Sequence, residues 1–87
     1  MTDAEINLAI AKLEYPETRN LKLWVEQNMV SFTEGWYDIG PSIEREKIGI
    51  RPISNGWEAF HGSSVVIADT PTRAAALCYL RIKGVEL

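Results

Sequence analysis

The residues whose types could most readily take part in catalysis lie late in the chain, where the single histidine, His61, is followed by Gly62, Ser63 and Ser64. A serine beside a histidine base could act as a nucleophile. However, no Gly-x-Ser-x-Gly sequence accompanies them, and serines are common in tight turns. We therefore interpret them as hairpin residues and expect no catalytic residue here. A small enzyme with a site near His61 is the last of the alternatives that we consider.

Ligands for a metal ion or a cofactor are sparse. One histidine and one cysteine, Cys78, lie far apart in the sequence and have no ligand spacing. The carboxylates of Glu44 and Glu46 are two residues apart and would point to different sides of a helix. The six glycines are dispersed, and none forms a phosphate-binding loop at a helix start. The sequence thus predicts no metal site and no cofactor.

Composition indicates one globular domain over residues 1–87, with 46% hydrophobic residues. The net charge is −3, without a long block of like charges, so nucleic acid is an unlikely partner. A lone cysteine is typical of a reducing compartment, and no apolar run reaches the length of a signal core or a membrane span. We expect a cytoplasmic protein without a membrane partner.

The elements that position these residues begin with a capping box. Thr2 and Glu5 are placed to cap each other's amides, and apolar residues follow at helical spacing, which predicts a helix over 3–13. The alternation in 21–25 predicts a strand, a possible fourth strand of the sheet. A second helix over 39–47 follows if Asp38 is its N-cap and Pro41 lies in its first turn.

Three strands are predicted over 48–53, 56–61 and 64–68. Asn55-Gly56 and Gly62-Ser63 supply the positive φ angles of tight two-residue loops, so the strands form an antiparallel meander. A last helix follows, with Asp69 or Thr70 as its N-cap and Gly84 closing it. The predicted class is α+β, a small antiparallel sheet with helices packed mainly on one face, in the order α-β-α-β-β-β-α.

The last helix is apolar on more than one side, which leaves two interpretations of its faces. Alanines, Cys78 and Tyr79 form a side suited to packing on a sheet, where a buried, unreactive thiol is the expected state of Cys78. On another side, Arg73, Leu77 and Arg81 recur every four residues with Leu80 beside them. That stripe is either a rim over the core or a contact surface for a partner protein or a second copy.

The three tryptophans, Trp24, Trp36 and Trp57, are core residues by default. Trp36 and Tyr37, however, lie in an irregular middle segment and could be surface aromatics that anchor an interface. We therefore include Trp36 and Tyr37 with the stripe as candidate partner-binding residues.

Three stretches together resemble a known family. They are 2–11 (TDAEINLAIA), 38–50 (DIGPSIEREKIGI) and 57–59 (WEA) followed by 71–75 (PTRAA). In this order they look like the NinX-like family of small proteins from tailed bacteriophages and prophages. Double-stranded RNA-binding domains also end in three strands and a helix, but their lysine cluster is reduced here to Arg73.

The resemblance implies a phage accessory protein and brings no catalytic residues with it. We expect a non-enzymatic module that binds a host or phage protein, and inhibition of a host defence or regulatory protein is the sharper form of this hypothesis. The alternative from another class is a nucleic-acid-associated accessory factor.

Overall fold

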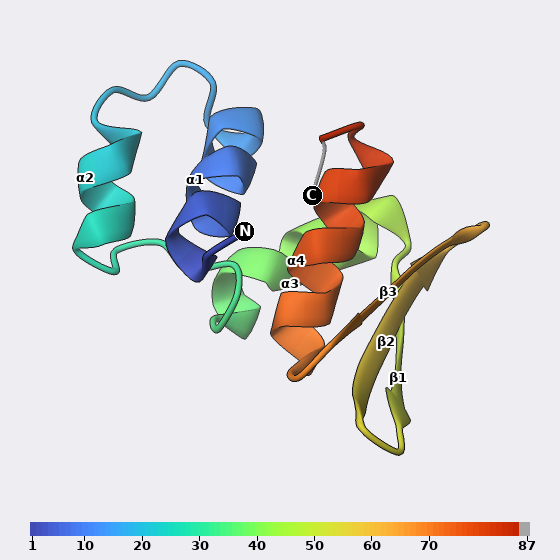
Figure 1. Cartoon of the computed structure of the whole chain (residues 1–87). Helices are drawn as coiled ribbons and strands as arrows, with labels where there is room; N and C mark the ends of the chain where they lie inside the picture. The colour runs from blue at the N-terminus through green and yellow to red at the C-terminus, as the bar shows by residue number, and fades with distance from the viewer. Residues whose placement is uncertain (86–87) are drawn as a thin grey trace.

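The computed structural model describes residues 1–85, in which four helices and three strands follow one another (Figure 1). The elements are α1 (Asp3–Glu14), α2 (Leu21–Glu26), α3 (Trp36–Glu46), β1 (Gly49–Ile53), β2 (Gly56–His61), β3 (Ser64–Ala68) and α4 (Pro71–Ile82). The order is therefore α-α-α-β-β-β-α, and the predicted α+β class is confirmed.

The first and last helices have the caps that their sequences predict. In α1 the Thr2 hydroxyl accepts from the Glu5 amide at 3.2 Å, and the Glu5 carboxylate accepts from the Thr2 amide at 2.9 Å. In α4 the Thr70 hydroxyl accepts from the Arg73 amide at 3.2 Å. Gly84 follows α4 with a φ of 80°, and its conformation lets the Val85 amide donate to the Leu80 carbonyl at 3.0 Å.

The predicted strand over 21–25 is wrong, because this segment forms the short helix α2. A run of five residues with apolar positions at both two-residue and four-residue spacing fits either structure. Leu21 and Val25, one helical turn apart, are the buried pair, whereas Leu23 is exposed. Packing against α1 rather than against a strand decides between the two periods.

The middle helix is longer than predicted. It begins at Trp36 with Gly35 as its N-cap, and the Asp38 carboxylate accepts from the Ser31 amide at 3.0 Å instead of capping the helix. Pro41 consequently lies inside α3 and not in its first turn. The ring nitrogen has no hydrogen, so the Tyr37 carbonyl lacks its usual donor from the next turn.

The sheet is an antiparallel meander in the order β1-β2-β3, and its bounds agree with the predicted strands to one residue. The second loop is Gly62-Ser63 as predicted, with Gly62 at φ 58°. The first loop is Ser54-Asn55 rather than Asn55-Gly56, because Ile53 pairs with Gly56. Gly56 nevertheless has a φ of 142°.

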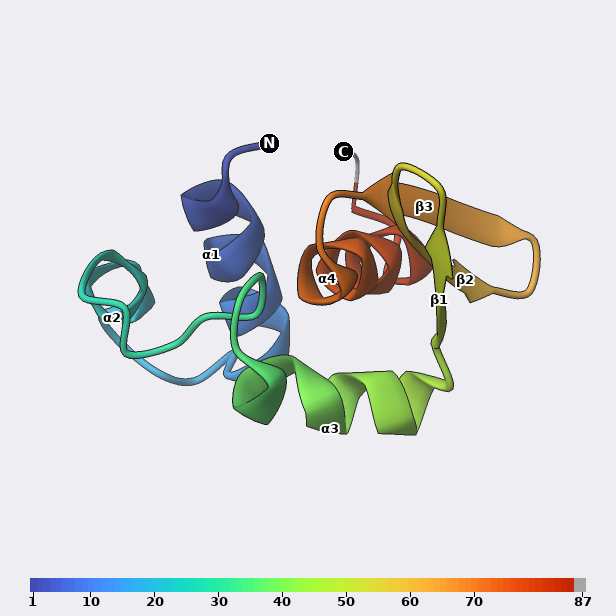
Figure 2. The same ribbon diagram turned by 90° about the horizontal axis from the view of Figure 1, so that it is seen from below.

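The sheet carries α4 on one face, where Ala59 and Val66 are buried beneath it. Figure 2 shows α4 between the sheet and α1, with α3 along a third side and α2 outermost beside α1. The largest fully buried side chains are Tyr79, Phe32, Ile6, Ile10, Ile39, Leu80, Cys78 and Ser42. Within residues 1–85, no helix is long and apolar enough to cross a membrane.

Candidate functional site

The stripe on α4 mostly serves the fold. Leu80 is 0% exposed and belongs to the core, so the expectation that it contributes to a contact surface is wrong. Leu77 is half-buried and packs against the same core. The rim interpretation fits both leucines, because α1 and α3 cover the sides of α4 that the sheet does not.

The two arginines of the stripe bind other parts of the chain. Arg73 forms an ion pair with Asp3 at the start of α1 and donates to the Met1 carbonyl at 3.2 Å. Arg81 donates to the Val65 carbonyl of β3 at 2.9 Å. These contacts hold α4 to the first residues of the chain and to the sheet, and little of α4 is left for a second copy.

Trp36 and Tyr37 lie on the surface, in the first turn of α3. Tyr37 is 93% exposed and Trp36 is 53% exposed, whereas Trp24 and Trp57 pack against the core. Of the two interpretations, core or surface, the structure therefore shows the surface position for Trp36 and Tyr37. The early start of α3 gives both side chains a regular helix as support.

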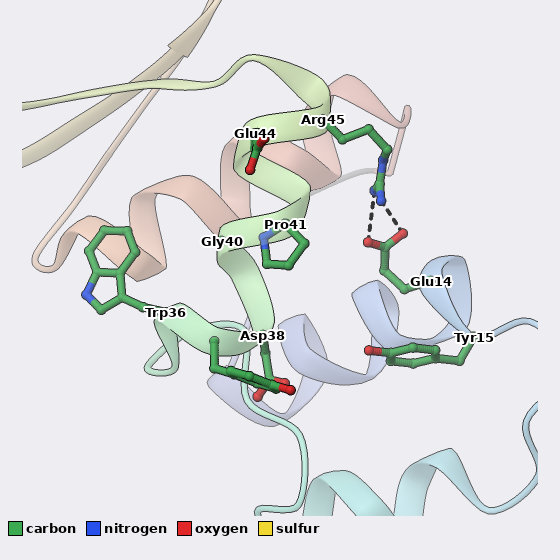
Figure 3. Close-up of a pocket in the computed structure, with 9 residues that line it drawn as sticks. Glu14, Tyr15, Trp36, Asp38, Gly40, Pro41, Glu44 and Arg45 are labelled. Atoms are coloured by element: carbon green, nitrogen blue, oxygen red, sulfur yellow. Dashed lines mark hydrogen bonds and ion pairs between the residues drawn. The ribbon is translucent and has the colours of Figure 1, made fainter.

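Beside this pair is an open hollow of about 790 Å³, which we call the aromatic hollow. It is lined by Glu14, Tyr15, Trp36, Tyr37, Asp38, Gly40, Pro41, Glu44 and Arg45. Figure 3 shows the end of α1 on one side, with Glu14 and Tyr15, and α3 on the other, with Trp36 pointing away from Tyr15. The hollow thus combines aromatic and proline rings with carboxylates.

The back of the aromatic hollow is fixed by hydrogen bonds to Glu14. Its carboxylate accepts from the Arg45 guanidinium at 2.8 and 3.0 Å, and Figure 3 shows the two side chains directed at each other. The same carboxylate accepts from the Ser42 hydroxyl at 2.6 Å and from the Tyr79 hydroxyl at 3.0 Å. One side chain of α1 is in this way joined to both α3 and α4.

This environment also sets the ionisation of the two acids that it contains. Burial alone would raise the pKa of the Glu14 carboxyl, but the hydrogen bonds from Ser42, Arg45 and Tyr79 outweigh it and hold the pKa below its ordinary value. Burial and the hydrogen bond to Glu14 raise the pKa of the Tyr79 hydroxyl. Glu14 therefore stays ionised and Tyr79 stays a donor at neutral pH.

The charged side chains of the lining that form no ion pair within residues 1–85 are acidic. Of its charged side chains, Arg45 is engaged by Glu14 and also donates to Glu46 at 3.0 Å. Glu44 is exposed, and Asp38 carries a charge that meets only a backbone amide in the described residues. The open surface beside the aromatic rings consequently carries uncompensated negative charge.

The other residues considered for chemistry lie elsewhere. His61 and Ser63 are exposed at the tip of the second hairpin, and no side-chain hydrogen bond joins them among residues 1–85. Cys78 is fully buried, as predicted, and burial raises the pKa of its thiol. In the part of the chain that the structure describes, no group of three or more histidine, cysteine or acidic residues could hold a metal ion.

Sequence reasoning found Trp36 and Tyr37 but missed the rest of the aromatic hollow. Tyr15 and Arg45 meet there only because the end of α1 lies against α3, a contact between residues about 30 positions apart. Tyr15 follows the last residue of α1 and precedes Pro16, which marked it as a helix end and gave no sign of a neighbour.

Comparisons with models of protein families, with curated proteins and with solved structures find no match to this chain.

Proposed function

We propose that this protein is a phage- or prophage-encoded accessory protein that acts in the host cytoplasm by binding another protein, without catalysis, through the aromatic hollow. The observation that carries the binding role is the 93% exposure of Tyr37 beside a half-exposed Trp36 on a regular helix. The phage setting rests on the resemblance to the NinX-like family in residues 2–11, 38–50, 57–59 and 71–75.

Contact of such aromatic side chains with water is unfavourable in free energy, and their burial by a partner protein is favourable. Tyrosine and tryptophan are enriched among the residues that dominate binding energy at protein interfaces, where each contributes on the order of 1–4 kcal/mol. The backbone of Trp36 and Tyr37 is ordered in α3, so that mainly side-chain rotation is lost when a partner covers them. Rigid support distinguishes them from the exposed Met29, which lies in a loop.

The charge of the aromatic hollow favours a basic segment of the partner. Lysine or arginine side chains can lie on the faces of tyrosine and tryptophan rings and pair with Glu44 and Asp38. The Tyr37 carbonyl, which has lost its helical donor to Pro41, offers a further acceptor to an arginine or lysine. Such a partner would also be steered towards a chain whose net charge is −3.

A quantitative capture experiment tests this function. Tagged wild-type protein and the Tyr37→Ala variant are incubated with a lysate of the bacterial host, and the retained proteins are compared by mass spectrometry. Because Tyr37 makes almost no contact within the chain, its loss should leave the fold intact and reduce capture of the specific partner about tenfold or more, equivalent to about 1.4 kcal/mol.

The matched control is Leu23→Ala in α2, which removes another exposed large apolar side chain that does not line the aromatic hollow. It should capture the same partner as the wild type. Retention that is equal for all three proteins would remove the aromatic hollow as the binding surface. Inhibition of a host defence or regulatory protein, the sharper form of the proposal, requires that the captured protein lose its own activity on binding.

A further inference from the structure

One stripe of α3 crosses the aromatic hollow. Tyr37, Gly40, Pro41 and Glu44 recur every three or four residues, so they lie above one another on one side of the helix. Gly40 has no side chain, and among residues 1–85 no atom beyond its chain neighbours and its own helix backbone lies within 4 Å of where its Cβ would be. The exposed side chains of Tyr37 and Glu44 are thus separated by an indentation over Gly40 and Pro41, which we call the α3 notch.

The α3 notch has a hydrogen-bond acceptor at each end. The Tyr37 carbonyl points along the helix axis towards Pro41, whose nitrogen has no hydrogen to donate. Figure 3 shows Glu44 one turn along α3 from Gly40 and Pro41. Helical side chains lean towards the start of their helix, which brings the Glu44 carboxylate back over that turn. The one cation of the lining, Arg45, is engaged by two other carboxylates.

The distance between the two acceptors fits a planar group with several donors. Seven residues at about 1.5 Å rise separate Tyr37 and Glu44 by about 10.5 Å along the axis. The direction of the carbonyl and the lean of the carboxylate bring the acceptors well inside this distance. The lining of the aromatic hollow carries three carboxylates and one guanidinium, so the group that fits between the acceptors is a cation.

We propose that the α3 notch binds an arginine side chain of the partner and prefers it to lysine, an inference that rests on the protein-binding function proposed above. The aliphatic stem of the arginine lies on the Tyr37 and Pro41 rings. Its planar guanidinium has donors on more than one edge, so one edge donates to the Glu44 carboxylate and another N–H donates to the Tyr37 carbonyl. A lysine ammonium is a compact, strongly hydrated point charge, which reaches one acceptor at the expense of the other.

Titration of the isotope-labelled full chain with short peptides, followed by NMR, tests this preference. The probes are three capped tripeptides with arginine, lysine or citrulline between two glycines; citrulline has nearly the shape of arginine but no charge. The arginine peptide should shift the amide signals of Gly40 and Glu44 with a dissociation constant on the order of 1 mM. The lysine peptide should bind about tenfold more weakly, and the citrulline peptide more weakly still.

Gly40→Leu fills the α3 notch and is the decisive variant. The new side chain enters open space, and leucine favours a helix more than glycine does, so the melting temperature should equal or exceed that of the wild type. Affinity for the arginine peptide should nevertheless fall about tenfold. A loss of binding without a loss of stability cannot come from a damaged fold.

A pair of matched variants isolates the charge. Glu44→Gln keeps an acceptor oxygen but removes the negative charge, so it should remove most of the difference between the arginine and citrulline peptides. Glu26→Gln on α2 neutralises an exposed acid that does not line the aromatic hollow, and it should bind all three peptides like the wild type.

The outcomes separate this proposal from the proposed function. Equal affinity for the arginine and lysine peptides, or unchanged binding by Gly40→Leu, would overturn the arginine preference, even where capture of a host protein depends on Tyr37 and supports the proposed function. Arginine-selective binding that Gly40→Leu abolishes supports the α3 notch. If that result came with capture that does not depend on Tyr37, the notch would stand and the proposed function would fail.

Discussion

Glu14 is the residue on which three helices depend. Its carboxylate at the end of α1 accepts hydrogen bonds from Ser42 and Arg45 of α3 and from Tyr79 of α4. Hydrogen bonds to a charged acceptor in a half-buried place are each worth more than those between neutral groups. The same carboxylate forms the back of the aromatic hollow, so a stable fold and a correctly shaped surface have a common cause.

The lowered pKa of Glu14 predicts a specific loss of stability in acid. A carboxyl with a lowered folded-state pKa contributes stability above its unfolded value, here 4.5, and the contribution disappears as the pH falls through the folded value. Glu14→Gln should therefore lower the free energy of unfolding by about 1–2 kcal/mol at pH 7, and the difference from the wild type should shrink below pH 4.5.

Urea unfolding of both proteins at a series of pH values measures this difference. Exposed Glu17→Gln is the control, for which the two curves should coincide. If the gap between wild type and Glu14→Gln stayed constant into acid, the carboxylate would not be the acceptor that stabilises the three helices.

At the scale of elements, a helix was predicted correctly where neighbouring residues determine it, and incorrectly where distant residues do. The ends of α1 and α4 are determined by local caps, Thr2 with Glu5 and Thr70 with Gly84, and both were predicted correctly. The type of α2 is determined by packing on α1, which no local pattern reveals. The start of α3 escaped prediction because Asp38, an apparent N-cap, bonds the loop amide of Ser31.

The first hairpin depends on Gly56 for two reasons. Its φ of 142° is rarely adopted by other residues, and a side chain there would press on the backbone carbonyl of Ala68. Gly56→Val should therefore lower the free energy of unfolding by about 2 kcal/mol or more, measured by urea titration. Gly62 is the control, since its φ of 58° suits asparagine and its surroundings are open, so Gly62→Asn should cost little. Equal effects of the two changes would mean that the Gly56 backbone is not held as described.

At the scale of the whole molecule, only part of the candidate site could be predicted from the sequence. Trp36 and Tyr37 could be flagged because two aromatics stood in a segment without a clear apolar period. Their neighbours could not, since Tyr15 comes to lie beside them through the side-chain contacts of Glu14, at the end of α1, with α3. The stripe on α4 looked free for the same reason. Asp3, which pairs with Arg73 of the stripe, lies 70 residues earlier in the chain.

Within residues 1–85, the aromatic hollow and the sheet face that carries Arg51 and Glu58 differ in charge. The aromatic hollow on α1 and α3 has an acidic lining, whereas the two charges on the sheet face, Arg51 and Glu58, form an ion pair with each other.

The most direct test of the central claim is photocrosslinking in the living host. Tyr37 is replaced by p-benzoylphenylalanine, another large aromatic residue, and Leu23 on α2 is replaced in the same way as the control. After irradiation, position 37 should form a covalent adduct with one host protein, and a crosslinked basic segment should be found by mass spectrometry, whereas position 23 should yield no such adduct. Adducts from position 23 with none from position 37 would contradict binding through the aromatic hollow.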